Sequence, residues 1–242
     1  MAAWASHLMV AEKVMAALPW LDRRGFCVGN IAPDCDLESE DWSSFTPPRE
    51  VTHWMTGKRK TAADAERFFE EYAKERLCES ACAEEKAFLW GYYSHLVTDA
   101  ECQKMIRSKE RVEAAWDRIK ANPELCERAK GMPENWDSIK LLFKKTDRYK
   151  DWHSIEHEYL SEHPDSGFIT EIIGLRSFPD YLDFLPKGAI IRKVRVMGVL
   201  PEKGACRYPF VPISKDEYLA FIENAARLVI NGISGRVIPS AT

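Results

Sequence analysis

The stretch GYYSHLVTDA, residues 91–100, decides the fold prediction because it places polar side chains inside an otherwise apolar, aromatic run. Apolar side chains recur at helical spacing through residues 83–105, which predicts a buried helix. His95 and Asp99 lie four positions apart and therefore share one side of that helix. An unpaired buried polar group costs about 1–3 kcal/mol, so a core helix that carries both groups needs partners for them.

Composition limits the classes of protein to which the chain can belong. The chain has 242 residues and 45% hydrophobic content, enough for a sizeable core. Its 34 basic and 38 acidic residues are mixed along the chain and leave a net charge of −4, so we expect no nucleic acid partner. No apolar run is long enough for a transmembrane segment. Seven irregularly spaced cysteines, with no basic leader before a long apolar run, favour reduced thiols and a cytoplasmic protein.

The sequence predicts an all-α fold, a multi-helix bundle around a metal site. The predicted helices cover residues 6–18, 61–77, 83–105, 108–121, 134–145, 150–162 and 214–230. Residues 29–48 are rich in Gly, Pro, Asp and Ser and predict a long loop, a kind of segment that is often functional. Residues 164–212 predict irregular structure with one short strand. We expect a helical metal-binding domain over 1–163, with 164–242 packing on it as an irregular segment plus a final helix.

Two of the predicted helices begin with a sequence typical of a capping box. Thr61 is followed by Asp64, and Ser214 is followed by Glu217. In each pair the hydroxyl and the carboxylate satisfy backbone N–H groups in the first turn, so both pairs predict a helix start.

Five polar residues in the first hundred lie where apolar ones are expected: His7, Asp34, His53, His95 and Asp99. Each has an ordinary explanation, since a lone histidine is commonly a hydrogen-bonded core residue and an aspartate after proline shapes turns. Together, the burial of all five has a free-energy cost that a shared binding partner must offset. Imidazoles and carboxylates are the ligands of zinc, and also suit iron or manganese, so one metal site satisfies all five.

The motifs SHLMVAEKV (6–14), GNIAPDCD (29–36), VTHW (51–54) and AFLWGYYSHLVTDA (87–100) resemble the zinc-dependent phospholipase C family. Its bacterial members are all-helical enzymes with a three-zinc cluster. An early histidine, a loop aspartate, a second histidine and a His-x3-Asp pair on a central helix bind those ions. The resemblance implies the same role here for the matching residues, which are His7, Asp34, His53, His95 and Asp99.

The resemblance weakens after residue 100. The bacterial enzymes have a further histidine and then a His-x3-Glu pair for another zinc, whereas TDAECQKMIRS (98–108) contains no histidine. The stretch DWHSIEHEYL (151–160) offers His153, with either His157 or Glu156 as its companion. The alternative is a solvated helix face, so we expect two or three zinc ions, with other divalent metals possible.

The resemblance implies a metal-dependent phosphodiester or phosphoester hydrolase in which a metal-activated water is the nucleophile. Asp34 is then the catalytic candidate that orients or deprotonates this water. Trp54 and Trp90 are candidate substrate-binding residues, although aromatic residues at such positions are more often core. The substrate is a phosphoester small molecule or a phospholipid headgroup.

Two other function classes compete with this prediction. A non-catalytic metal-binding structural or sensing protein is favoured by the missing histidine after Asp99. A helical nucleotide phosphohydrolase with adjacent His and Asp ligands ranks last, because no His-Asp dipeptide occurs in the sequence.

Overall fold

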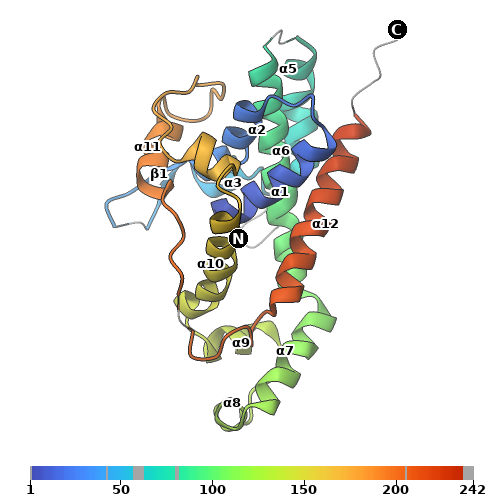
Figure 1. Cartoon of the computed structure of the whole chain (residues 1–242), viewed down its shortest axis with the longest axis vertical. Helices are drawn as coiled ribbons and strands as arrows, with labels where there is room; N and C mark the ends of the chain where they lie inside the picture. The colour runs from blue at the N-terminus through green and yellow to red at the C-terminus, as the bar shows by residue number, and fades with distance from the viewer. Residues whose placement is uncertain (1, 42, 57–62, 80–81, 205, 237–242) are drawn as a thin grey trace. The chain divides into compact units, whose positions relative to one another are not determined.

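The structure is a computed structural model that describes residues 2–41, 43–56, 63–79, 82–204 and 206–236. Most of these residues are helical (Figure 1), which confirms the all-α prediction. The strands in the described part of the chain are two short segments, β1 (Leu37–Glu38) and β2 (Phe45–Thr46), paired as an antiparallel hairpin. None of the described helices combines the length and apolar composition needed to cross a membrane.

The chain divides into two compact units. The first comprises Met1–Ala100, Pro164–Val199 and Ile222–Thr242, and the second comprises Glu101–His163 and Leu200–Phe221. One of these borders falls at residues 163 and 164, where we placed a boundary; the domain assignment itself stays a prediction.

Most elements lie within one unit. The first unit contains the hairpin and α1 (Trp4–Ala17), α2 (Arg23–Gly29), η1 (Ala32–Asp34), α3 (Arg49–Thr52), α4 (Ala65–Phe68), η2 (Phe69–Ala73), α5 (Lys74–Glu79), η3 (Phe168–Ile172) and α11 (Ala189–Met197). The second contains α7 (Lys109–Ala121), α8 (Pro123–Arg128), α9 (Trp136–Leu142) and α10 (Lys145–Glu162). Two long helices, α6 (Ala83–Arg107) and α12 (Lys215–Ser234), each contribute residues to both units.

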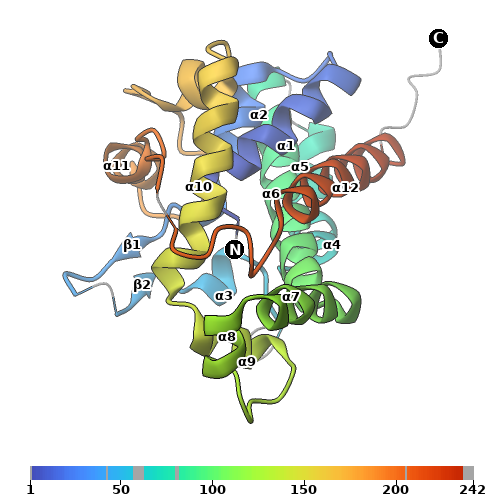
Figure 2. The same ribbon diagram turned by 60° about the horizontal axis from the view of Figure 1, so that its bottom comes forward.

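In the first unit, α1, α2 and the N-terminal part of α6 lie side by side (Figures 1 and 2). Helix α2 touches α6 through glycines, because a Cβ on Gly29 would lie 2.1 Å from the Phe88 carbonyl oxygen. On the facing surface a Cβ on Gly91 would lie 2.2 Å from the Phe26 carbonyl oxygen. No side chain fits at either position, so the two backbones pack directly against each other. This contact places Asn30, the residue after α2, next to His95.

Of the two predicted capping boxes, the second forms as predicted, whereas at the first Asp64 is itself the N-cap of α4, three residues later than expected. The Asp64 carboxylate accepts from the Arg67 backbone N–H at 2.9 Å and begins α4, while its predicted partner Thr61 lies outside the described residues. The predicted helix then continues through the π-turn η2 into α5. At α12 the Ser214 hydroxyl accepts from the Glu217 N–H at 3.1 Å, and the Glu217 carboxylate accepts from the Ser214 N–H at 2.6 Å. This capping box is confirmed.

Two structural predictions are wrong. The β-branched run at 189–197 forms helix α11 rather than a strand, because Ala189, Ile190, Lys193 and Val194 recur at helical spacing and are buried. The Lys193 ammonium pairs with Asp36 and Glu38, so tertiary contacts override the β-propensity of this run. The predicted loop at 29–48 contains the turn η1 and the hairpin, and α2 and α8 were not predicted.

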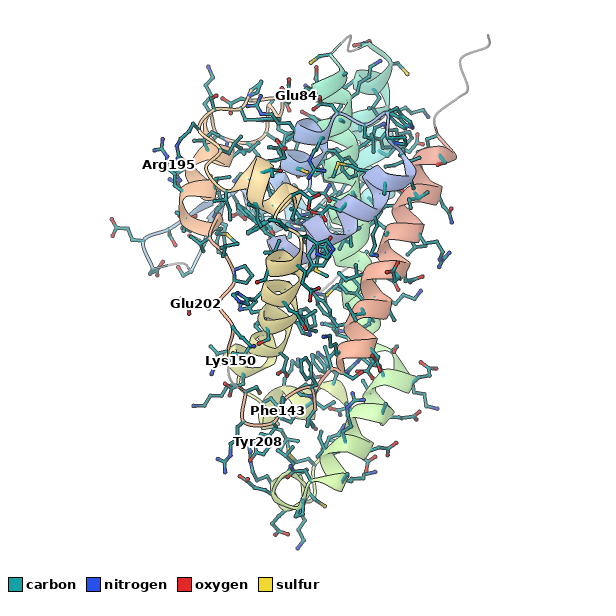
Figure 3. The ribbon with its side chains drawn as sticks, viewed as in Figure 1. Glu84, Phe143, Lys150, Arg195, Glu202 and Tyr208 are labelled. Carbon is teal, nitrogen blue, oxygen red and sulfur yellow. The ribbon has the colours of Figure 1, made fainter. Side chains whose placement is uncertain are left out.

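The second unit has a core of its own. Helices α7, α8 and α9 gather together in Figure 2, and their apolar side chains pack into one cluster. Its buried members are Val112, Ala115, Trp116, Ile119, Leu125, Ala129, Ile139, Leu142 and Phe143. A cavity of about 550 Å³ opens beside this cluster, and Phe143, Lys150 and Tyr208 are among the residues that line it (Figure 3).

Candidate metal centre

Five predicted ligands meet in the first unit, from four separate elements. His7 lies on α1, Asp34 ends η1, His53 follows α3, and His95 and Asp99 lie on α6. The three histidines are fully buried, and the Asp99 side chain is 3% exposed. Donor atoms of His7, His95 and Asp99 all lie within 4.8 Å of one another, and so do those of Asp34, His53 and His95. Both groups can hold a metal ion.

The spacing of these donor atoms fits zinc. In a tetrahedral zinc site with bonds of about 2.0–2.1 Å, two ligand nitrogens lie about 3.3–3.4 Å apart. Nε2 of His95 lies 3.3 Å from Nε2 of His53. Nε2 of His53 also lies 3.5 Å from Asp34 Oδ1 and 3.5 Å from Asp99 Oδ2. The chemistry and spacing of this donor set therefore suit a zinc ion.

The orientation of His95 is set by helix α2. Its Nδ1 lies 2.7 Å from the Asn30 carbonyl oxygen, which can only accept a hydrogen bond. The ring proton is therefore on Nδ1, and Nε2 presents its lone pair to the cluster, as a zinc ligand requires. Burial, reinforced by the neighbouring His7, lowers the pKa of His95 to about 3. The ring is thus neutral at physiological pH, the form that binds metal.

His7 supplies a second sign of a ligand site. Its ring stacks on His95 with centroids 3.8 Å apart and an interplanar angle of 3°. Both His7 ring nitrogens are buried and have no hydrogen-bond partner among the described residues, and Nε2 lies 3.6 Å from Asp99 Oδ1, beyond hydrogen-bond distance. Leaving buried polar atoms unsatisfied costs free energy, and coordination of an ion by Nε2 would recover part of it.

His53 is positioned by the end of α3. The Trp54 N–H donates to the Val51 carbonyl at 3.2 Å, and the Met55 N–H donates to the Glu50 carbonyl at 2.9 Å. This is a Schellman ending, with Trp54 in the left-handed position at φ 55° that glycine usually occupies. A bulky residue there is strained. His53 directly precedes this turn, and its ring lies with Nδ1 2.9 Å from the Thr52 hydroxyl and Nε2 3.3 Å from Nε2 of His95.

Both carboxylates remain charged despite their burial. Burial alone would raise the pKa of Asp34, but the His95 and His53 rings and the Arg49 guanidinium bring it below the usual range. Burial is likewise outweighed at Asp99, where His7, His95 and Arg49 hold the pKa well below its usual value. The Asp34 side chain is 15% exposed, so it is the more accessible of the two carboxylates. Charged carboxylates are the form that ligates a cation.

The later candidate ligands lie in the second unit. His153 is half-buried on α10 with its ring on Tyr149, and Nδ1 of His157 lies 3.1 Å from the Pro201 carbonyl oxygen. Glu156 is buried and accepts from the Tyr218 hydroxyl at 3.1 Å. Among the described residues, the two groups of donors that can hold an ion include none of these three. Their role as ligands stays a prediction.

The two candidate substrate-binding tryptophans lie in aromatic clusters of the first unit. Trp54 is half-buried, with its ring 5.7 Å from Phe68 and 5.8 Å from Tyr72. Trp90 is 5% exposed and stacks on Phe69 at 5.6 Å. Trp54 follows His53 directly and stays near the cluster through the backbone, whereas the contacts of Trp90 are those of a core residue.

The sequence prediction missed two residues of the centre, Arg49 and Asn30. Arg49 precedes His53 by four positions, so a helix over 49–52 would have placed both on one side. Two glycines, Gly29 directly before Asn30 and Gly91 four residues before His95, were a signal for the close helix contact that brings Asn30 to His95.

A comparison with known proteins identifies the part of the chain that carries this centre. Residues 6–102 match a family model described as zinc dependent phospholipase C. Over this segment the chain is similar to the zinc-dependent phospholipase C family. The resemblance seen in the motifs is thereby confirmed, and the matched phospholipase C segment contains all five clustered ligands but neither His153 nor His157. No curated protein and no solved structure matches the chain.

Proposed function

We propose that this protein is a zinc-dependent phosphoester hydrolase whose centre is built from His7, Asp34, His53, His95 and Asp99. The observation that carries the proposal is the meeting of three buried imidazoles and two charged carboxylates at zinc spacing, in a phospholipase C family segment. A bound zinc ion supplies Lewis acidity, which lowers the pKa of water toward neutrality and polarises a phosphoryl oxygen.

The other roles in the proposed reaction belong to residues of the chain itself. His95 and His53 present neutral rings, and the Asn30 carbonyl fixes the orientation of His95. Asp34 is our candidate to orient the attacking water and to accept its hydrogen bond, because its carboxylate is both charged and partly accessible. Asp99, almost fully enclosed, acts as a ligand and as the acceptor for Arg49.

The proposed substrates are a small phosphoester or a phospholipid headgroup. Trp54 is retained as the candidate contact for an apolar or choline-bearing group, since it is half-buried, lies in an aromatic cluster and follows His53 directly. A cytoplasmic location and a bound zinc number of two or three belong to the same proposal.

The first test is metal content. Protein purified without chelator is analysed for bound metal alongside the double variant His95→Ala/Asp99→Ala, which should lose at least one equivalent per chain. His163→Ala is the matched control, because this exposed histidine caps its own helix through the Tyr159 carbonyl. An unchanged metal count in the double variant would refute the assignment.

The second test is turnover of chromogenic phosphodiesters and phosphomonoesters, with and without chelator. Chelator-sensitive hydrolysis that disappears in Asp34→Asn supports the proposal. The alternative function is a structural or sensing protein that binds metal without turnover, and the absence of a histidine between residues 100 and 108 favours it. Full metal occupancy without hydrolysis of either ester class would select that alternative.

A further inference from the structure

One cation contacts both carboxylates of the centre. The Arg49 guanidinium donates from Nη2 to Asp99 Oδ2 at 2.5 Å and from Nη1 to Asp34 Oδ1 at 3.3 Å. Among the described residues, no other Lys or Arg nitrogen lies within 4.0 Å of either carboxylate. Arg49 begins α3 and its carbonyl accepts from the His53 N–H at 2.8 Å, so the guanidinium and a proposed ligand share one short support.

Exposure increases from the histidines to this arginine. His7, His53 and His95 are fully buried, the Asp34 side chain is 15% exposed, and the Arg49 side chain is 28% exposed. Of the side chains at the centre, that of Arg49 is the most exposed to solvent. A partly exposed cation at the centre is available to an anion that comes from solvent.

An ion and the guanidinium would share the same oxygen atoms. Asp99 Oδ2, which Arg49 contacts, also lies 3.5 Å from His53 Nε2, and Asp34 Oδ1 lies at the same distance from that nitrogen. Two cations that share carboxylate oxygens repel each other, and an anion that contacts both of them removes the repulsion. The planar guanidinium has five N–H donors in a fork that matches the oxygens of phosphate.

We propose that Arg49 is a phosphate-binding residue of this centre, which turns from the two carboxylates to the phosphoryl oxygens of the substrate when zinc is bound. This inference rests on the proposed function and assigns its substrate contact. It makes Arg49 a recognition element for any phosphoester, whether a lipid headgroup or a soluble molecule.

The test measures binding of inorganic phosphate by the zinc-loaded protein, using calorimetry, for wild type, Arg49→Lys and Arg49→Met. We expect Arg49→Met to bind zinc with equal or higher affinity, since a competing cation is removed, and to lose phosphate affinity at least tenfold. Arg49→Lys should fall between the two, because it keeps the charge without the fork. Arg227→Met, which removes an exposed arginine on α12, is the control for loss of positive charge.

The outcomes separate this inference from the proposed function. Unchanged phosphate affinity in Arg49→Met overturns the inference while leaving zinc binding and hydrolysis intact. Loss of zinc or of thermal stability in Arg49→Met also overturns it, because Arg49 would then be a structural counter-ion of the carboxylates. Absence of zinc binding in wild type refutes the proposed function itself. A comparison of the hydrolysis rates of soluble phosphoesters and of phosphocholine-lipid vesicles then identifies the source of the phosphate.

Discussion

The carboxylates of the metal centre in the first unit and a buried carboxylate of the second unit have opposite pKa shifts. In the first, Asp34 and Asp99 are buried among imidazoles and a guanidinium, and their pKa values are lowered. In the second, Asp151 is buried on α10, and burial, opposed only in part by a hydrogen bond from the Phe210 N–H, raises its pKa to about 6. A buried carboxylate is thus a prepared metal ligand only where several elements bring cations or imidazoles to it.

The histidines show the same contrast. His7, His53 and His95 come from three elements and converge, whereas His153 and His157 share α10 and have separate neighbours. A spacing of four residues places two side chains on one helix face in both units. That spacing alone does not make a site, because a third donor must come from another element.

The largest expected effect is that of a side chain added at the glycine contact between α2 and α6, on which the position of Asn30 beside His95 depends. Gly91→Ala places a Cβ 2.2 Å from the Phe26 carbonyl oxygen, so α2 and α6 must separate. We expect a loss of about 3 kcal/mol in the free energy of unfolding, measured by urea denaturation, because rigid backbone cannot relax as a side chain does. Metal affinity should fall as well, since Asn30 moves away from His95. Val97→Ala, on the same helix, is the control, and an equal cost for both variants would contradict the packing argument.

A smaller effect separates the two sets of candidate ligands. Asp99→Asn should weaken zinc binding by more than about 100-fold, which exceeds the 10–100-fold typical of residues that only orient a ligand. His153→Ala/His157→Ala should leave both the zinc stoichiometry and the affinity of the first centre unchanged. Competition with a chromogenic chelator measures both. Loss of one equivalent in the α10 double variant would show that these histidines hold an ion of their own.

The smallest effect concerns the pH dependence of stability. Asp151 has a folded-state pKa of about 6, raised from 3.8. Its contribution to stability is therefore fully present below about pH 4 and is lost as the pH rises through 6. In wild type, we expect the free energy of unfolding to fall by about 1–3 kcal/mol between pH 4 and pH 6 as Asp151 ionises. Asp151→Asn keeps an acceptor for the Phe210 N–H but cannot ionise, so this fall should be absent from the variant. Denaturant midpoints across this range, compared with wild type, provide the measurement; parallel curves would show that Asp151 does not ionise there.

Local patterns predicted much of the fold. The period of apolar residues identified α1, α6, α7 and α12, and the Ser214 and Glu217 pair marked the start of α12, because these signals depend on neighbours a few residues apart. Helix α11 was predicted as a strand because its β-branched residues carry a local preference that burial against distant groups reversed. Short helices such as α2 have too few turns to show a period.

The five proposed ligands, their types and their order along the chain were determined by the sequence itself, since imidazole and carboxylate chemistry and the family motifs can be read without coordinates. Only the tertiary structure decided that they converge, which tautomer His95 adopts and that Arg49 joins them. These depend on the glycine contact between α2 and α6 and on the turn that ends α3, where residues up to 65 positions apart come within hydrogen-bond distance. Such contacts are set by packing of the whole unit: a local feature such as Gly29 or Gly91 signals a close contact but does not identify the segment that makes it.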